Sequence, residues 1–356
     1  MVLAAAALVI FGLVSISSGS SRSGDFLNFN KQAIFFGIGF FIFLAASFFD
    51  WRNFRESSAL ILALYFFSIA GLVGLYFFGS ANRGVRTWYD LGFATIDPIE
   101  WLKPALLLLL AKYFSWRYAA MYQIRHIFLT GFYVGVPLAL IFFQPNLGPC
   151  LVIAAFWLGM LVVAGIRAKH LLAIAVCFLA FLAAGWLFFL QDYQKNRILS
   201  FFNGYDPLGV SWSQNQARIA LGTGGLLGKG FGNGPQTQYG FLSEPQTDFI
   251  FSAIGEEFGI LGIAAILALL LFLIGRLTKA AIAAPDNFSR LFLAGLAILI
   301  FAEAAIHIGV NVGFLPIIGL PLPLVSYGGS NLIATFALLG VAQSIIVSSR
   351  ASIIEK

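Results

Sequence analysis

Long apolar runs recur along the whole chain and are separated by short stretches of polar and small residues. An α-helix needs about 20 mostly apolar residues to cross the roughly 30 Å hydrocarbon core of a bilayer. The runs do not alternate with a period of two, which argues against a membrane β-barrel. The predicted spans are 2–18, 33–49, 59–78, 98–114, 127–143, 148–166, 169–190, 249–275, 289–312 and 327–348. The pattern therefore predicts an all-α integral membrane protein, a polytopic bundle of about ten transmembrane helices in one domain, 1–356.

The composition excludes several classes of protein. Hydrophobic residues make up 60% of the 356 residues and charged residues 10%, and the mean hydropathy is +0.91. A soluble domain carries about 25% charged residues, so soluble enzymes, disulfide-rich secreted scaffolds and disordered tails are excluded. The net charge of +6 is spread without a basic run, so we expect no nucleic-acid partner.

The placement of Lys and Arg predicts the orientation, because short cytoplasmic loops are enriched in these residues. With a cytoplasmic N-terminus, twelve of them fall on the inner side and four in short outer loops. Both termini are therefore predicted to be cytoplasmic, with membrane lipid around the bundle. The segment 191–247 becomes one long extracytoplasmic loop between the seventh and eighth spans. Loops of this length are usually functional, and its scattered aromatic residues predict short amphipathic helices along the membrane surface.

Five acidic or basic residues stand out inside predicted spans, where charge is costly and usually marks function. Glu100 and Lys103 are three residues apart, so they share a helix face and can pair. Such a pair could serve catalysis or could lock two helices together. Glu256 and Glu257 point about 100° apart on a helix, so at least one faces the bundle interior, and we expect a packing role for both. Glu303 is the fifth.

Asp248 lies where the long outer loop becomes the eighth span, directly after Thr247. One interpretation is a helix N-cap or first-turn acid, which would stabilise the helix by about 0.5–2 kcal/mol. Thr247 could cap the helix equally well. The other interpretation is a general base, because a carboxylate at the lipid–water boundary beside a polar loop is well placed to deprotonate a hydroxyl group. The residues alone leave both interpretations open.

Further uncommon polar residues fall on the same predicted outer side. Asn146 lies in a tight outer turn, Ser326 lies where the tenth span begins, and Arg86 lies in a short outer loop. No glycine motif for phosphate or dinucleotide binding follows a strand, and no Gly-x-Ser-x-Gly elbow occurs. The three histidines are scattered, without metal-ligand spacing. The outer face around Asp248 is therefore the candidate site.

Six motifs occur in a characteristic order and cover nearly the whole chain. They are Gly79-Ser80 to Arg86-Thr87-Trp88, Pro98-Ile99-Glu100-Trp101-Leu102-Lys103, Phe143-Gln144-Pro145-Asn146-Leu147-Gly148, Gly224-Gly225-Leu226-Leu227-Gly228-Lys229-Gly230 with Gln236-Thr237-Gln238, Thr247-Asp248-Phe249-Ile250-Phe251 with Gly255-Glu256-Glu257, and 315–323 with Ser326-Tyr327-Gly328-Gly329-Ser330. Together they resemble the SEDS family, the peptidoglycan glycosyltransferases named for shape, elongation, division and sporulation. The string around Asp248 is the most specific of the six.

The resemblance implies an enzyme that polymerises lipid II into glycan strands on the outer face of the bacterial cytoplasmic membrane and releases undecaprenyl diphosphate. It implies that Asp248 is the essential catalytic residue and that Glu100 and Lys103 support it. It also implies a partner, a class B penicillin-binding protein that acts as the transpeptidase. The segment 315–323 lacks the Thr-Lys-Gly usual in the division (FtsW-like) branch, so the chain looks more like the elongation (RodA-like) branch, which serves rod shape.

On this interpretation, Asp248 deprotonates the GlcNAc 4-hydroxyl of lipid II, which then attacks the anomeric carbon of the lipid-linked glycan strand with inversion. The diphosphate leaving group is a weak base, so a second, protonating carboxyl group is dispensable, unlike in glycosidases. Cations would stabilise the charge of the leaving diphosphate; Lys103 and Arg86 are the first candidates, and Arg197, Arg218 and Lys229 are weaker ones. The predicted substrate-binding or supporting residues are Glu100, Lys103, Arg86, Asn146, Arg197, Arg218, Lys229 and Ser326.

Three positions depart from the family pattern. Asn146 stands where the family usually has Asp, Pro149 where a small residue is usual, and His307 where Asn is common. The resemblance leaves open whether a divalent cation, Mg²⁺ or Mn²⁺, takes part. Its candidate ligands are Glu100 and Asp248, and the missing carboxylate at Asn146 would weaken its binding.

Two other functions fit the same residues. A flippase, a transporter of lipid-linked cell-wall precursors, would also suit an outward cavity with an internal Glu–Lys pair. Against it, the polar groups gather on one side of the membrane and not at its midplane. An inactive scaffold for the transpeptidase is the third candidate, favoured if Asn146 disables the site.

Overall fold

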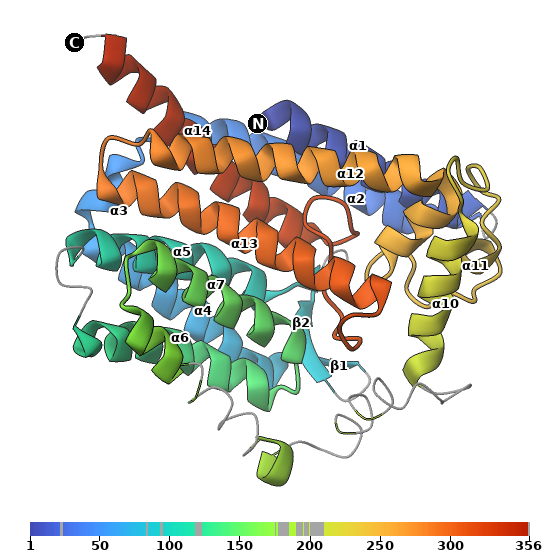
Figure 1. Ribbon diagram of the computed structural model, residues 1–356, viewed down its shortest axis with the longest axis horizontal. Coiled ribbons are helices and arrows are strands. Elements are labelled where there is room, and N and C mark those ends of the chain that lie inside the picture. Colours follow the sequence, from blue (N-terminus) through green and yellow to red (C-terminus); the bar gives the residue numbers. More distant parts are fainter. Residues whose placement is uncertain are drawn as a thin grey trace.

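The computed structural model describes residues 1–21, 24–82, 85–92, 95–117, 123–174, 176, 185–189, 195, 199 and 210–354. Most of its helices run side by side along the long axis of the molecule (Figure 1). The elements are α1 (Val2–Ser21), α2 (Leu27–Phe48), α3 (Arg52–Glu56), α4 (Ser58–Phe78), β1 (Ser80–Asn82), β2 (Val85–Asp90), β3 (Thr95–Ile96), α5 (Pro98–Trp116), α6 (Ile124–Phe143), α7 (Leu147–Val163), a π-helical turn (Gly185–Phe189), α10 (Val210–Thr223), α11 (Pro235–Gln238), α12 (Ile250–Ile282), α13 (Asn287–Val312) and α14 (Gly329–Ile354).

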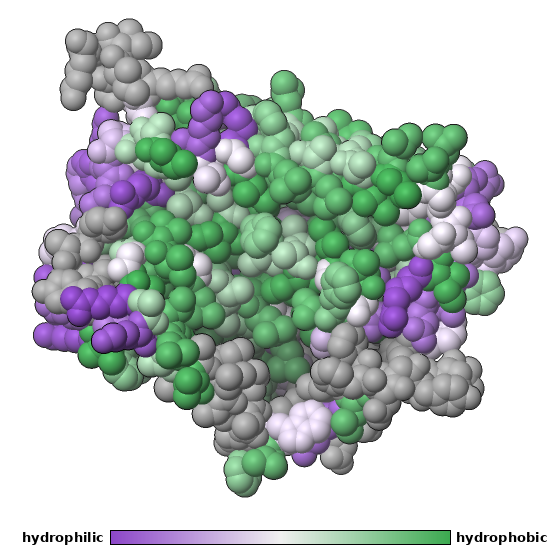
Figure 2. Space-filling model, in the orientation of Figure 1, coloured by the Kyte–Doolittle hydropathy of each residue, from purple (hydrophilic) through white to green (hydrophobic). Residues whose placement is uncertain are grey.

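The prediction of an all-α membrane bundle is confirmed. Within the described residues, seven helices are long and apolar enough to cross a membrane: α1, α2, α4, α6, α12, α13 and α14. The shorter apolar helix α7 and the charged helix α5 coincide with two further predicted spans. The predicted span 169–190 falls largely outside the described residues. Apolar side chains cover much of the surface, as Figure 2 shows for one face, and this is the surface that lipid requires.

A small antiparallel sheet, β1–β2–β3, lies between α4 and α5. The hydroxyl of Tyr89 on β2 donates to Gly71 O on α4 over 2.7 Å, which holds the sheet against the bundle. We call the end of the bundle that carries this sheet, α10, α11 and the connection 313–328 the β end. The sheet was not predicted, because its strands are short and lack alternating apolar positions.

Short helices in the long segment 191–247 are confirmed for its described part, where α10 and α11 lie. Figure 1 shows α10 crossing the β end of the bundle at a steep angle to α12. The side-chain amide of Gln214 on α10 donates to Val310 O over 2.9 Å and to Leu315 O over 2.6 Å. The helix α10 is thereby attached to the end of α13. Its placement along a membrane surface stays a prediction.

The helix α12 is interrupted at Gly259, which has φ 65° and ψ −160°, a conformation that residues with a Cβ avoid. The break exposes backbone groups that a continuous helix would pair. Chain from the long loop pairs them: Ile260 N donates to Gly225 O over 2.9 Å, and Lys229 N donates to Glu256 O over 2.9 Å. The first turns of α12, which follow Asp248, are therefore fastened to the loop.

Candidate active site

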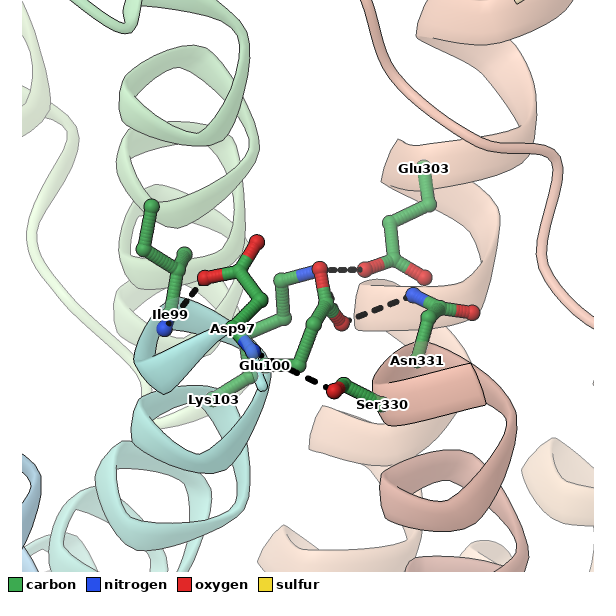
Figure 3. A network of polar contacts seen from close by, with 7 residues as sticks. All are labelled: Asp97, Ile99, Glu100, Lys103, Glu303, Ser330 and Asn331. Atoms are coloured by element: carbon green, nitrogen blue, oxygen red, sulfur yellow. Dashed lines mark hydrogen bonds and ion pairs between the residues drawn. The ribbon is translucent and has the colours of Figure 1, made fainter. Parts of the chain in front are cut away.

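A buried ammonium group joins two helices inside the bundle (Figure 3). Nζ of Lys103 on α5 lies 2.7 Å from Oε1 and 2.8 Å from Oε2 of Glu100. It also lies 2.5 Å from Oε1 of Glu303 on α13. Lys103 is 4% exposed, so removing one partner would leave a buried charge unpaired. The predicted Glu100–Lys103 pair exists, and the structure adds Glu303 to it.

The first turn of α14 closes this cluster against the start of α5 (Figure 3). Asn331 Nδ2 donates to Glu100 Oε2 over 2.8 Å. Asp97 N donates to Ser330 Oγ over 3.2 Å, and Asp97 Oδ1 accepts from Ile99 N over 2.8 Å, which caps α5. Burial, together with the nearby Glu100 carboxylate, raises the pKa of the Asp97 carboxyl to about 7. Glu100 and Lys103 are thus part of a junction of α5, α13 and α14.

Asp248 lies directly before α12, which begins at Ile250 with Phe249 in the N-cap position. The candidate base therefore precedes the cap and does not occupy it. Its half-buried side chain faces the connection 313–328: a Cβ placed on Gly319 would lie 3.5 Å from Asp248 Oδ2. The glycine leaves room beside the carboxylate.

The main chain at Asp248 is held from α13. Asn311 Nδ2 donates to Asp248 O over 3.0 Å, while Asn311 Oδ1 accepts from Ser252 N (3.1 Å) and Ser252 Oγ (2.7 Å). One turn earlier, His307 Nδ1 lies 2.7 Å from Leu320 O. Glu303, His307 and Asn311 recur every four residues and share one helix face. Asn311 was not among the predicted site residues, although this spacing was a visible signal.

The segment 326–331 connects the two parts of the site. Ser326 Oγ donates to Thr247 O over 2.7 Å, beside Asp248, and the same segment ends at the Glu100 cluster. Gln32 on α2 holds its middle: Gln32 Nε2 donates to Ser326 O and Gln32 Oε1 accepts from Gly328 N, both over 3.1 Å. Gln32 is 1% exposed. It was also missed, and only tertiary packing identifies it.

Two other predicted residues lie around the connection 313–328. Asn146 is half-buried and precedes α7. Two residues on, Gly148 packs so closely that an added Cβ would lie 2.6 Å from Ile318 O. Arg218 on α10 is exposed and packs against Gly313: a Cβ added to this glycine would lie 2.7 Å from Arg218 Nε. Asn146 and Arg218 therefore belong to the same end of the molecule as Asp248.

The structure says less about the other three predicted residues, Lys229, Arg86 and Arg197. Lys229 is exposed, and only its backbone is tied to the first turns of α12. Arg86 lies on β2, but its side chain lies outside the described part of the structure, as does the whole of Arg197. A role in substrate binding stays a prediction for these three.

The two carboxylates at the end of the first α12 segment bind the long loop. Glu256 Oε1 accepts from Gln236 N over 2.8 Å, and its Oε2 accepts from Thr237 N (3.0 Å) and Thr237 Oγ1 (2.8 Å). Glu257 Oε1 accepts from Gln238 Nε2 in the loop over 3.1 Å and from Ser18 Oγ on α1 over 2.5 Å. These contacts agree with the packing role expected for both residues.

Glu100 does not fit the predicted divalent-cation site. Both of its oxygens accept from Lys103 Nζ, and one also accepts from Asn331, so an ammonium group occupies the place of a metal ion. Among the described residues, no three His, Cys, Asp or Glu side chains gather as ligands. A cation near Asp248 stays a prediction, and no step below uses one.

Comparison with known proteins decides the family. The family model FTSW_RODA_SPOVE, described as cell cycle protein, matches residues 1–351. The chain belongs to this family, the SEDS family. Its SEDS relatives include the peptidoglycan glycosyltransferase MrdB of Escherichia coli, 36% identical over 283 residues (79% of this chain and 76% of MrdB). The probable peptidoglycan glycosyltransferase FtsW of Geobacter metallireducens is 33% identical over 355 residues (96% and 92%).

Solved SEDS structures have the same fold. A chain from a study of polymerisation and crosslinking by a peptidoglycan synthase complex superposes with a TM-score of 0.79 and 30% identity, covering 98% of this chain and 97% of that one. The rod shape determining protein RodA of Thermus thermophilus gives a TM-score of 0.69 at 28% identity, covering 98% and 95%. The predicted SEDS resemblance and multi-pass membrane architecture are both confirmed.

Proposed function

We propose that this SEDS protein is a peptidoglycan glycosyltransferase that polymerises lipid II at its β end, with Asp248 as general base. The observation that carries the proposal is the half-buried Asp248 carboxylate beside Gly319, with its main chain fixed by Asn311. A base must be held in place to act on a substrate hydroxyl. The names of MrdB and of the Geobacter FtsW support the same activity.

In the proposed reaction, Asp248 takes the proton of the GlcNAc 4-hydroxyl as that oxygen bonds to the anomeric carbon of the lipid-linked strand. The bond from that carbon to the diphosphate breaks, and the electron pair leaves with undecaprenyl diphosphate. We assign Arg218 as a cation for the leaving group, because it is exposed at the β end.

Lys103 takes a different role in this proposal. Its ammonium group already has three carboxylate contacts, to Glu100 and Glu303, and its three N–H donors are thereby used. We therefore assign Lys103 and Glu100 as positioning residues that fix α5 against α13 and α14.

The proposal also covers the orientation in the membrane, the branch of the family and the partner protein. The excess of Lys and Arg in loops away from the β end favours cytoplasmic termini and an extracytoplasmic Asp248. The segment 315–323 favours the RodA-like branch, although relatives from both branches have similar identities. The complex that contains a structural relative couples polymerisation to crosslinking, which supports a class B penicillin-binding protein as partner.

The test is gel-resolved polymerisation of purified lipid II, alone and with the cognate transpeptidase, by the wild type, Asp248→Ala and Asp248→Asn. We expect a glycan ladder from the wild type and none from either variant, although both remain folded. A ladder from Asp248→Asn would refute the general base. A folded wild type that makes no polymer but moves lipid II across vesicle membranes would favour the flippase.

A further inference from the structure

A cavity lies away from the β end, between three helices. It measures about 240 Å³, several times the roughly 30 Å³ that a water molecule occupies. Its walls come from the start of α1, the last third of α12 and the second half of α14. The lining residues are Met1, Val2, Leu3, Arg276, Gln343 and Ile346.

Two polar side chains that face this cavity have no hydrogen-bond or ion-pair partner within the described residues. Arg276 is half-buried and makes no hydrogen bond or ion pair with another described side chain, and none of the lining residues is acidic. The Gln343 amide is also half-buried and makes no side-chain hydrogen bond within the described residues. A guanidinium group that is partly removed from water favours an anionic acceptor, and oxygen atoms of phosphate suit it well.

The other lining side chains are apolar, which limits the kind of anion. Val2 and Ile346 line the cavity, and Leu3 beside it is 85% exposed to the surroundings of the bundle. Arg276 lies six residues before the last residue of α12, or about 9 Å along the helix axis. That depth lets a long cationic side chain reach the head-group region while its stem stays in the apolar layer.

We propose that this cavity is a binding site for an anionic phospholipid, with the phosphate on Arg276 and Gln343 and an acyl chain along Leu3. The site joins the ends of α1, α12 and α14, so a bound lipid fastens these three helices together. It is separate from the Asp248 site, and its occupancy does not depend on the glycosyltransferase activity.

The test is thermal unfolding and native mass spectrometry of the full chain in detergent, with no lipid II present. Dioleoylphosphatidylglycerol, dioleoylphosphatidylcholine and inorganic phosphate are titrated separately. We expect phosphatidylglycerol to raise the melting temperature and to remain bound, with little effect from the other two. Arg276→Ala should need about tenfold more phosphatidylglycerol for the same shift, because one charge-assisted contact is lost.

Two further variants test whether lipid binding depends on the cavity itself. Lys279→Ala removes an exposed cation one turn away on α12 that does not line the cavity, and it should behave as the wild type. Gln343→Leu should weaken lipid binding and serves as the second variant if Arg276→Ala fails to fold. Equal losses in Lys279→Ala and Arg276→Ala, or equal effects of the two lipids, would overturn the proposal. A full shift with phosphate alone would assign the site to a free anion.

Discussion

The side-chain amide of Asn311 on α13 donates to the main-chain oxygen of Asp248 over 3.0 Å, 63 residues away in sequence. The same side chain accepts two hydrogen bonds from Ser252 in the first turn of α12. Asn311 is fully buried, so none of these bonds can be replaced by bulk water. The position of the candidate base is thus set from a second helix and not by its own loop alone.

Replacing Asn311 by Ala should lower kcat more than it raises KM. The reason is that Asp248 O loses the hydrogen bond from Asn311, so the Asp248 carboxylate is no longer held in place. The substrate-binding surface is unchanged. A tenfold or larger loss of kcat is expected from a misplacement of about 1 Å. Ser252→Ala is the control, because the Ser252 backbone N–H still donates to Asn311. Equal losses in the two variants would contradict the positioning role.

Replacing Lys103 by Met should destabilise the protein by about 3–5 kcal/mol, because two buried carboxylates lose their shared cation. The variant Lys103→Met combined with Glu303→Gln should recover part of that loss, since one charge is then removed. Thermal unfolding in detergent measures both. If the double variant is no more stable than the single one, repulsion between Glu100 and Glu303 is not the cause.

Replacing Gln32 by Ala should destabilise the segment 326–328, which loses a donor to Ser326 O and an acceptor for Gly328 N. Each buried group left unpaired costs about 1–3 kcal/mol. Hydrogen exchange at Gly328 N should accelerate more than exchange within α6. Unchanged protection at Gly328 would show that the segment is held by its other contacts.

Stability should fall as the pH rises from about 4 to above 7, in part through Asp97. Its pKa is raised from 3.8 to about 7 in the folded protein, so the folded state holds a proton that the unfolded state releases over this range. Asp97→Asn keeps a capping side chain for α5 but removes the titration. The melting temperature of this variant should depend less on pH between 5 and 8, and an unaltered pH profile would contradict the assignment.

The membrane bundle could be predicted because the requirement for apolar residues is local. The predicted span 98–114 and the observed α5, Pro98–Trp116, share their first residue. The partners of Lys103 could not be predicted in the same way: Glu303 lies 200 residues further along the chain, and only packing brings the two together. The same applies to Gln32 and the segment that it holds. The residue types in the sequence indicated which side chains could take part in the site. The arrangement of those side chains depends on contacts between helices that are distant in the sequence.

The break at Gly259 has a further consequence for how the molecule is built. The residues just before it and just after it, up to Leu261, are bonded to the long loop, and the later turns are packed in the bundle. The length of the membrane crossing and the position of Asp248 are therefore set by separate pieces of structure. A residue inserted into α12 beyond Leu261 should rotate and lengthen the crossing while leaving the Asp248 carboxylate beside Gly319. The length of the crossing and the geometry of the site can therefore be changed independently of each other.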